Sequence, residues 1–211
     1  MRKPTALFLL SLAAIAAAPI VIAQQMPTEA PGKPDPGRVV AGTYSVDPHH
    51  TLVGWRVNHM GFNDYFGQFG NVTGTLVLDP AKPANAKLDV TIPVASLSTV
   101  SADLTKHMLG PDFFDSAKYP DARFVSTRVQ VAGTEAVVTG NLTLRGITRP
   151  VTLKARFVGA GKGVPQAGSK ETVGFHATGS INRGDFGMGY GLALVPDPIQ
   201  LELTAAFEKQ P

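Results

Sequence analysis

Apolar and polar side chains alternate along residues 88–94, and this period of two constrains the fold more than any other feature of the sequence. Leu88, Val90 and Ile92 fall on one face, while Asp89 and Thr91 fall on the other. Successive side chains of a β-strand point to opposite faces, so this segment predicts a strand with one apolar and one wet face. The same alternation recurs at residues 72–78, 136–144, 151–157, 173–181 and 199–207. With further strands expected at residues 51–59 and 123–131, the chain has about eight.

The apolar faces of these strands need a common interior. Closing an antiparallel sheet into a barrel supplies one and also removes exposed sheet edges. The 22 Gly, 17 Pro and 17% charged residues favour many short elements joined by turns. Residues 98–118 lack the alternation, and Ser101 and Gly110 stand there as helix start and stop signals. We therefore predict an all-β fold, an antiparallel barrel of about eight strands with one or two short helices.

The first 38 residues differ from the rest in composition. Residues 1–23 begin with two basic side chains, continue as an apolar run and end in small residues, which predicts a signal peptide cleaved after Ala23. A retained membrane anchor is the alternative, because the run approaches the roughly 20 apolar residues that span a bilayer. Residues 24–38 contain four prolines and hardly any large apolar side chain, which predicts a flexible leader. The folded domain is expected to cover residues 39–211.

Charge and residue types exclude several classes of function. Removing Arg2 and Lys3 from the 19 basic residues leaves 17 against 16 acidic ones, a net charge of +1 that offers no basic field for nucleic acid. The chain has no Cys, which excludes disulfides, thiolate metal sites and cysteine nucleophiles. His50 and His59 would point to opposite faces of a strand, so we expect no metal site. We find no nucleophile elbow or carboxylate pair, and we expect no catalytic residue and no enzyme activity.

Four segments carry a more specific pattern. They are YSVDPHHT at residues 44–51, FFD at residues 113–115 followed by YP at 119–120 and RF at 123–124, GNLTLRGITRPV at 140–151, and INRGDFGM at 181–188. In this order and spacing they resemble the YceI-like family, also described as polyisoprenoid-binding proteins. The resemblance implies a periplasmic, lipocalin-like barrel whose long cavity holds an isoprenoid or similar lipid chain, without catalysis.

The barrel and the resemblance together suggest which side chains contact a ligand. Each buried methylene of an apolar chain contributes about 0.8 kcal/mol, so no charged contact is needed for the tail. For the head group the candidates are His50, His59 and Arg183. The aromatic cluster at residues 62–69 and the apolar residues at 108–114 either guard the mouth of the cavity or simply close the core. The expected ligand contacts are Val53, Trp55, Val57, His59, Phe62, Phe66, Phe69, Leu88, Val90, Ile92, Met108, Phe113, Phe114, Phe124, Phe175, Phe186 and Met188.

We therefore expect a periplasmic binding or carrier protein that holds one long amphiphile, with no cofactor beyond a bound isoprenoid, quinone or fatty-acid-like lipid. The alternative is a stress-related scavenger of diverse hydrophobic compounds such as quinones or drugs. A quinone-linked redox enzyme and a ligand-free structural barrel are weaker alternatives. The expected partner is a small hydrophobic or amphiphilic ligand. The sequence is also compatible with transient membrane contact and with a dimer, and it does not determine the oligomeric state.

Overall fold

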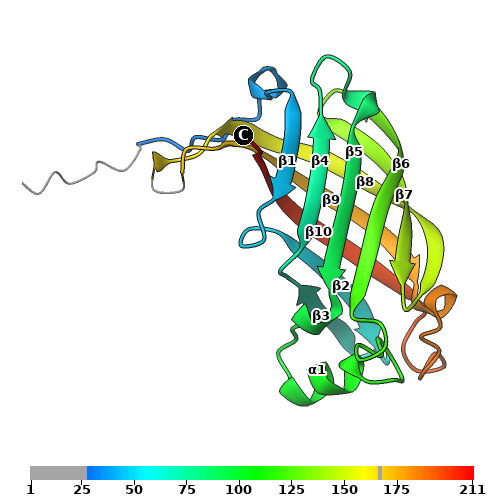
Figure 1. Ribbon diagram of the computed structural model, residues 1–211. Helices are drawn as coiled ribbons and strands as arrows, with labels where there is room; N and C mark the ends of the chain where they lie inside the picture. The colour runs from blue at the N-terminus through cyan, green and yellow to red at the C-terminus, as the bar shows by residue number, and fades with distance from the viewer. Residues whose placement is uncertain (1–27, 166–167) are drawn as a thin grey trace, which may run out of the picture.

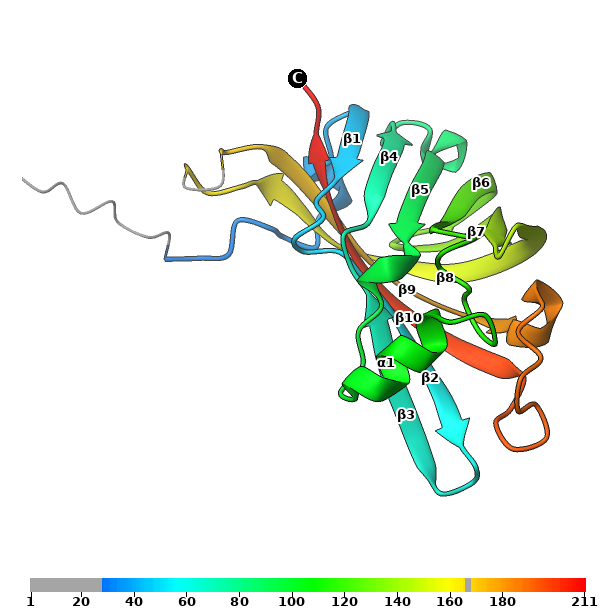
Figure 2. The same ribbon diagram turned by 60° about the horizontal axis from the view of Figure 1, so that its bottom comes forward.

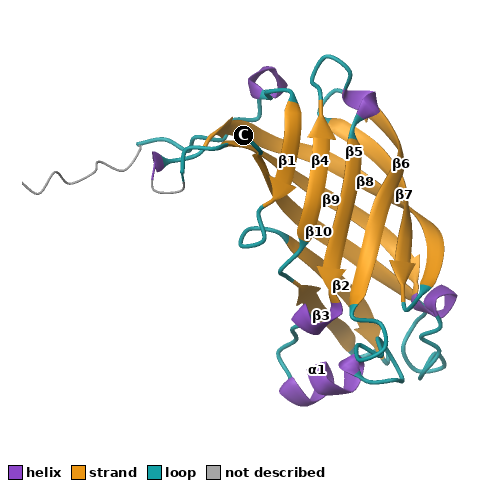
Figure 3. Ribbon diagram, in the orientation of Figure 1, coloured by secondary structure: helices purple, strands orange, loops and turns teal. Residues whose placement is uncertain are grey.

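The computed structural model describes residues 28–165 and 168–211, so the expected signal peptide and the first four residues of the expected leader lie outside the described part. Within it the chain forms ten strands and one α-helix of eight residues (Figures 1 and 3). The helix is α1 (Ala102–Leu109), and the strands are β1 (Gly42–Val46), β2 (Leu52–His59), β3 (Asn63–Phe69), β4 (Thr73–Leu78), β5 (Lys87–Pro93), β6 (Asp121–Ala132), β7 (Glu135–Leu144), β8 (Ile147–Lys162), β9 (Glu171–Asn182) and β10 (Pro198–Lys209).

Eight of the strands close into a ring, which confirms the predicted antiparallel barrel. The ring runs β1-β4-β5-β6-β7-β8-β9-β10, and β10 returns to pair with β1. The hairpin β2–β3 continues beyond the ring at one end. There β10 pairs with β2 through residues 200–204, whereas it pairs with β1 through residues 207–209. Because β1 pairs with β4 and β2 pairs with β3, the first four strands form one long hairpin. One arm is β1 followed by β2, and the other is β3 followed by β4.

Two strands were not predicted, β1 and β3. The residues of β3 alternate regularly in the structure, but Phe66 faces outward and Gly67 faces inward, so the sequence shows no clean apolar face. The single helix agrees with the predicted one or two. Ser101 begins it by accepting a hydrogen bond from the Leu104 backbone N–H at 3.3 Å, and Gly110 ends it.

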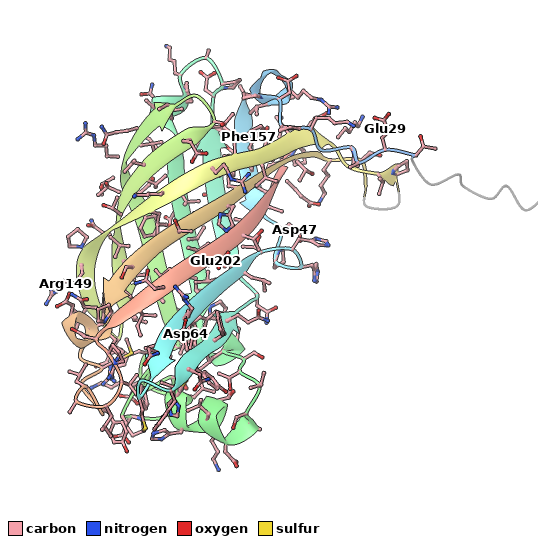
Figure 4. All side chains as sticks on the ribbon, turned by 180° about the vertical axis from the view of Figure 1, so that it is seen from behind. Glu29, Asp47, Asp64, Arg149, Phe157 and Glu202 are labelled. Carbon is pink, nitrogen blue, oxygen red and sulfur yellow. The ribbon has the colours of Figure 1, made fainter. Side chains whose placement is uncertain are left out.

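Alternation sorts the side chains between the interior and the outer face of the barrel. Apolar residues from all sides form one core cluster, in which Tyr44, Val94 and Val173 are fully buried. Charged side chains such as Glu202 on β10 and Asp64 on β3 lie on the outside (Figure 4). Among the described residues, no helix is long and apolar enough to cross a bilayer.

Residues 28–38 run beside the far end of β8 (Figure 2). The Lys33 backbone donates to the Ala160 carbonyl at 3.1 Å and accepts from the Ala160 N–H at 2.9 Å. A short 3-10 turn at Pro36–Arg38 then leads into β1. At the opposite end of the barrel, α1, the β2–β3 hairpin and the loop between β9 and β10 gather together (Figure 2).

Candidate functional site

The interior of the barrel is hollow rather than filled by its side chains. The larger of two cavities has a volume of about 660 Å³, within the range typical of small-molecule sites. Asn63 from the β2–β3 hairpin, Leu104 from α1 and Val195 from the β9–β10 loop all line it. The cavity therefore extends to the end of the barrel where these three segments gather.

Most of the predicted ligand contacts line this larger cavity. They come from β2, β3, β5 and β6, from α1 and the turn that follows it, and from the β9–β10 loop, all of which border one space. The predicted residues that line it are Val53, Trp55, Val57, His59, Phe69, Leu88, Val90, Ile92, Met108, Phe113, Phe114, Phe124, Arg183 and Met188.

Four of the predicted ligand contacts do not line this cavity. Phe62 stands at the hairpin turn with 84% of its side chain exposed, and Phe66 lies on the outer face of β3 with 61% exposed. Phe175 lines the second cavity instead. Phe186 is fully buried in the 3-10 turn after β9, among the residues of the core cluster.

A larger set of lining residues was not singled out from the sequence, although the alternation was visible. These residues lie on the inward faces of β7, β8, β9 and β10, and β10 contributes half of them. The set comprises Leu142, Leu144, Val151, Leu153, Ile181, Ile199, Leu201, Leu203, Ala205 and Phe207.

A second cavity of about 450 Å³ occupies the other end of the barrel. Pro36, Val39 and Pro83 line it there, next to the 3-10 turns before β1 and β5. The two cavities have five lining residues in common, on β5, β8 and β10, so the same side chains border both cavities. The shared residues are Leu88, Leu153, Leu203, Ala205 and Phe207.

His50, one of the head-group candidates, lies in the turn between β1 and β2. Its Nδ1 is 2.6 Å from Oδ2 of Asp47, and 76% of its side chain is exposed. Burial raises the pKa of Asp47, but the hydrogen bonds from His50 and the His49 backbone outweigh it and leave this pKa lowered. His50 therefore stabilises the turn and lies outside both cavities.

Arg183 is another head-group candidate, and the residue is only 4% exposed. Its nitrogens donate to the backbone carbonyls of Met188 (2.8 Å), Tyr190 (2.7 Å), Val195 (2.8 Å) and Pro196 (3.2 Å). Burial lowers the pKa of Arg183. Four of the five guanidinium N–H groups thus hold the β9–β10 loop, and the side chain acts mainly as the organiser of that loop.

Two buried donors stand in contrast to Arg183. Across the described part of the chain, the Trp55 indole Nε1 and the Tyr65 hydroxyl are the buried side-chain atoms that have no hydrogen-bond partner. Both residues line the larger cavity, on the paired strands β2 and β3. The sequence predicted Trp55 as inward-facing and placed Tyr65 in the aromatic cluster at residues 62–69, but did not include Tyr65 among the expected ligand contacts.

The chemistry of the cavity is that of a binding site. Its lining is overwhelmingly aliphatic and aromatic, and burial of an apolar molecule there is favourable by about 25 cal/mol per Å² of apolar surface removed from water. The described residues contain no group of three or more His, Asp or Glu side chains arranged to hold a metal ion.

The sequence matches a known protein family and several of its members. A family model described as a YceI-like domain matches residues 44–207. A UPF0312 protein from Pseudomonas putida (strain F1) is 40% identical over 177 residues, which cover 82% of this chain and 90% of the relative. A UPF0312 protein from Photorhabdus laumondii is 41% identical over 149 residues, 70% of this chain and 76% of the relative.

Solved structures of similar fold include BcnA from Burkholderia cenocepacia, with a TM-score of 0.68 and 28% identity over 76% of this chain and 98% of BcnA. The YCEI protein of Campylobacter jejuni has a TM-score of 0.64 and 29% identity over 73% of this chain and 90% of that protein. A polyisoprenoid binding domain from Saccharophagus degradans, 13% identical with a TM-score of 0.56 over 79% of this chain and 98% of that domain, shares the fold alone. The match of the family model over nearly the whole barrel shows that this chain belongs to the YceI-like family.

Proposed function

We propose that this protein is a periplasmic carrier that holds one long isoprenoid-like lipid chain inside its barrel and carries out no chemistry on it. The observation that carries the proposal is the apolar interior, in which two cavities of about 660 and 450 Å³ meet at shared lining residues. A compact ligand needs one cavity only, whereas a long flexible chain fills both. The domain of the same fold from Saccharophagus degradans is a polyisoprenoid binding domain, which agrees with this ligand class.

Burial accounts for the affinity of such a complex. Each methylene moved from water into the barrel contributes about 0.8 kcal/mol, so about two additional carbons strengthen binding tenfold. A carrier of this kind shows an affinity that rises with chain length until both cavities are full. A protein that scavenges diverse hydrophobic compounds shows no such optimum.

The ligand is proposed to enter at the end where α1, the β2–β3 hairpin and the β9–β10 loop gather. Exposed apolar side chains lie on or beside all three segments: Phe62 in the hairpin turn, Val100 just before α1 and Leu194 in the β9–β10 loop. Isolated exposed apolar residues are ordinary, but these surround the end of a lipid-sized cavity. Aromatic side chains at such tips insert readily into the interfacial region of a bilayer. Transient contact with a membrane would let the chain leave the bilayer without crossing water.

The experiment that tests the proposal is native mass spectrometry of the protein isolated from its own cells, followed by organic extraction and identification of the released molecule. One lipid of defined mass, bound at one copy per chain, is the expected result. Titration with isoprenoid alcohols of graded length, followed through the fluorescence of Trp55, then measures the length optimum, since Trp55 is the single tryptophan of the chain. A protein that emerges empty and binds none of the added chains overturns the proposal.

The expected localisation is tested separately. Fractionation of the producing cells, with determination of the N-terminal residue of the purified protein, is expected to recover a periplasmic chain that begins at Gln24. A chain that retains residues 1–23 in the membrane fraction contradicts cleavage and favours an anchored protein.

A further inference from the structure

The wall of the larger cavity contains two hydrogen-bond donors with no acceptor. The Trp55 indole Nε1 and the Tyr65 hydroxyl are both closed off from solvent, and neither has a partner in the described protein. The two rings lie close together, with centroids 6.4 Å apart and planes inclined by 31°. Buried Trp and Tyr side chains normally find a partner for their polar atoms, because an unsatisfied buried donor is destabilising. A pair of them in one wall indicates a place where an acceptor arrives from outside the protein.

The indole of Trp55 is held in place by its neighbour on the adjacent strand. Trp55 is opposite Gly67 in the register of β2 and β3, and a Cβ added at residue 67 would lie 2.9 Å from the indole Nε1. The indole therefore lies against the bare backbone of Gly67. The side chain is 7% exposed, so packing on this side leaves it little freedom to turn toward water.

The remaining lining of the cavity does not provide a site for a charged group. Of the described residues that line it, Arg183 alone carries a permanent charge, and four of its N–H groups already bind backbone carbonyls. The hydroxyl of Thr51 is occupied by both the N–H and the carbonyl of Ala206. A phosphate or carboxylate placed at this depth would lose its hydration without gaining a counter-ion, which is strongly unfavourable.

We propose that the ligand carries a neutral acceptor oxygen, of the ketone or ester carbonyl class, and that Trp55 and Tyr65 bind this oxygen at the part of the cavity wall formed by β2 and β3. This inference rests on the proposed function, because it specifies the chemistry of the chain that the barrel holds. It assigns to β2 and β3 a specificity-determining role that the apolar lining cannot have. A hydrocarbon of equal length fits the same space but leaves both donors unsatisfied.

The test uses two ligands that differ in one group: farnesylacetone, and the hydrocarbon in which a methylene replaces its carbonyl. Competition against a fluorescent fatty-acid analogue gives the ratio of their dissociation constants for each variant. For the natural chain the ketone is expected to bind roughly five- to tenfold more tightly, the usual contribution of a neutral hydrogen bond. Tyr65→Phe and Trp55→Phe should each move this ratio toward one. Tyr190→Phe, the same chemical change at a side chain outside the lining, should leave the ratio unchanged.

A second measurement separates ligand recognition from a structural role. Removing a hydroxyl that has no partner in the empty protein relieves an unfavourable burial, so Tyr65→Phe should unfold at the same urea concentration as the natural chain or a higher one. A hydroxyl with a structural partner would give the opposite change. Lower stability of ligand-free Tyr65→Phe therefore contradicts the inference.

The outcomes distinguish this inference from the function on which it rests. If both ligands bind with equal affinity, and Tyr65→Phe leaves their ratio unchanged, the barrel still binds lipid chains but the acceptor site is refuted. If neither ligand binds, nor any longer chain, the proposed function fails and the inference fails with it. A ketone preference that is lost in both variants and kept in Tyr190→Phe supports the site.

Discussion

The ring of Phe124 lies over Gly140, across the pair of strands β6 and β7. A Cβ added at residue 140 would stand 2.3 Å from Cζ of Phe124 and 2.6 Å from the carbonyl oxygen of Val125. Because that oxygen belongs to the backbone, turning the ring aside would not remove the clash. Phe124 is buried and lines the larger cavity. The absence of a side chain at one position of β7 thus determines where an aromatic ring of β6 lies in the cavity wall.

Gly140→Ala is therefore expected to destabilise the barrel by about 1–3 kcal/mol, the usual cost of overpacking a well-packed interior. Urea unfolding monitored by circular dichroism measures the change. Gly189→Ala is the matched control, because its nearest neighbour would be 4.0 Å away, and it should change the free energy of unfolding by less than about 0.5 kcal/mol. Equal stability of the two variants would show that the Phe124 ring has room to move.

Ala205 lies at the junction of the two cavities, and a larger side chain there should divide them. Ala205→Phe is expected to leave the affinity for short isoprenoid alcohols unchanged and to weaken binding of long ones by about tenfold for every two methylenes excluded. Fluorescence titration with chains of graded length measures this. Thr178→Phe adds the same ring on the outer face of β9 and serves as control. An equal loss for all chain lengths would place the whole ligand in one cavity.

Phe62 and Phe66 are exposed on the β2–β3 hairpin, outside the cavity. Replacing both with Ser should slow the uptake of a lipid from vesicles by roughly tenfold, because less apolar surface is available for contact with the bilayer. The affinity for the same lipid delivered from a cyclodextrin complex should not change. Stopped-flow transfer assays measure the rate. Unchanged uptake would mean that the ligand does not pass over this hairpin.

Arg183→Lys should destabilise the β9–β10 loop, because one ammonium group cannot reach the four carbonyls that the guanidinium binds. We expect a loss of about 3 kcal/mol in the free energy of unfolding, together with faster proteolysis within residues 184–197. Arg149→Lys is the control, because among the described residues the Arg149 guanidinium donates only to the carbonyl of its neighbour Thr148. A stable and protease-resistant Arg183→Lys would contradict the role assigned to Arg183.

Asp89 on β5 accepts two hydrogen bonds from Arg123 on β6, at 2.9 and 2.6 Å, and they lower the pKa of this carboxyl from its ordinary value of 3.8. A lowered pKa means that the ionised form is favoured in the folded state. Its contribution to stability is complete above pH 3.8 and is lost as the pH falls through the lowered value. Urea unfolding between about pH 2 and pH 7 should therefore show Asp89→Asn less stable than the natural chain at pH 7, by a small margin because the pair is exposed. The two chains should converge at the lowest pH, and a constant difference across the range would refute the assignment.

The barrel was predictable from the sequence because most strands have one dry and one wet face. Leu88, Val90 and Ile92 follow that rule, and all three line the cavity. The hairpin strand β3 breaks it, since Phe66 faces out and Gly67 faces in. The sequence pattern reports burial, and β3 lies at the rim of the barrel, where burial is incomplete.

The contents of the interior were less predictable. Alternation shows that Leu203 and Phe175 face inward, but it does not show whether the space between inward residues is filled or hollow. The division into two cavities depends on the sizes of five side chains contributed by three strands, β5, β8 and β10, which lie far apart in the sequence. The unpartnered hydroxyl of Tyr65 depends on which groups fail to reach it, and no local pattern reports that.

Closure of the ring joins Tyr44 to Lys209, so the first strand of the barrel pairs with the last. Contacts between such distant residues are slow to form, because the intervening chain must be ordered before they stabilise anything. A ribosome-bound chain lacks β10 until residues 198–209 have been synthesised, and until then β1 and β2 have no β10 to pair with. The ring therefore closes only once residues 198–209 are available, and until then its apolar interior stays accessible to other binding partners, chaperones among them.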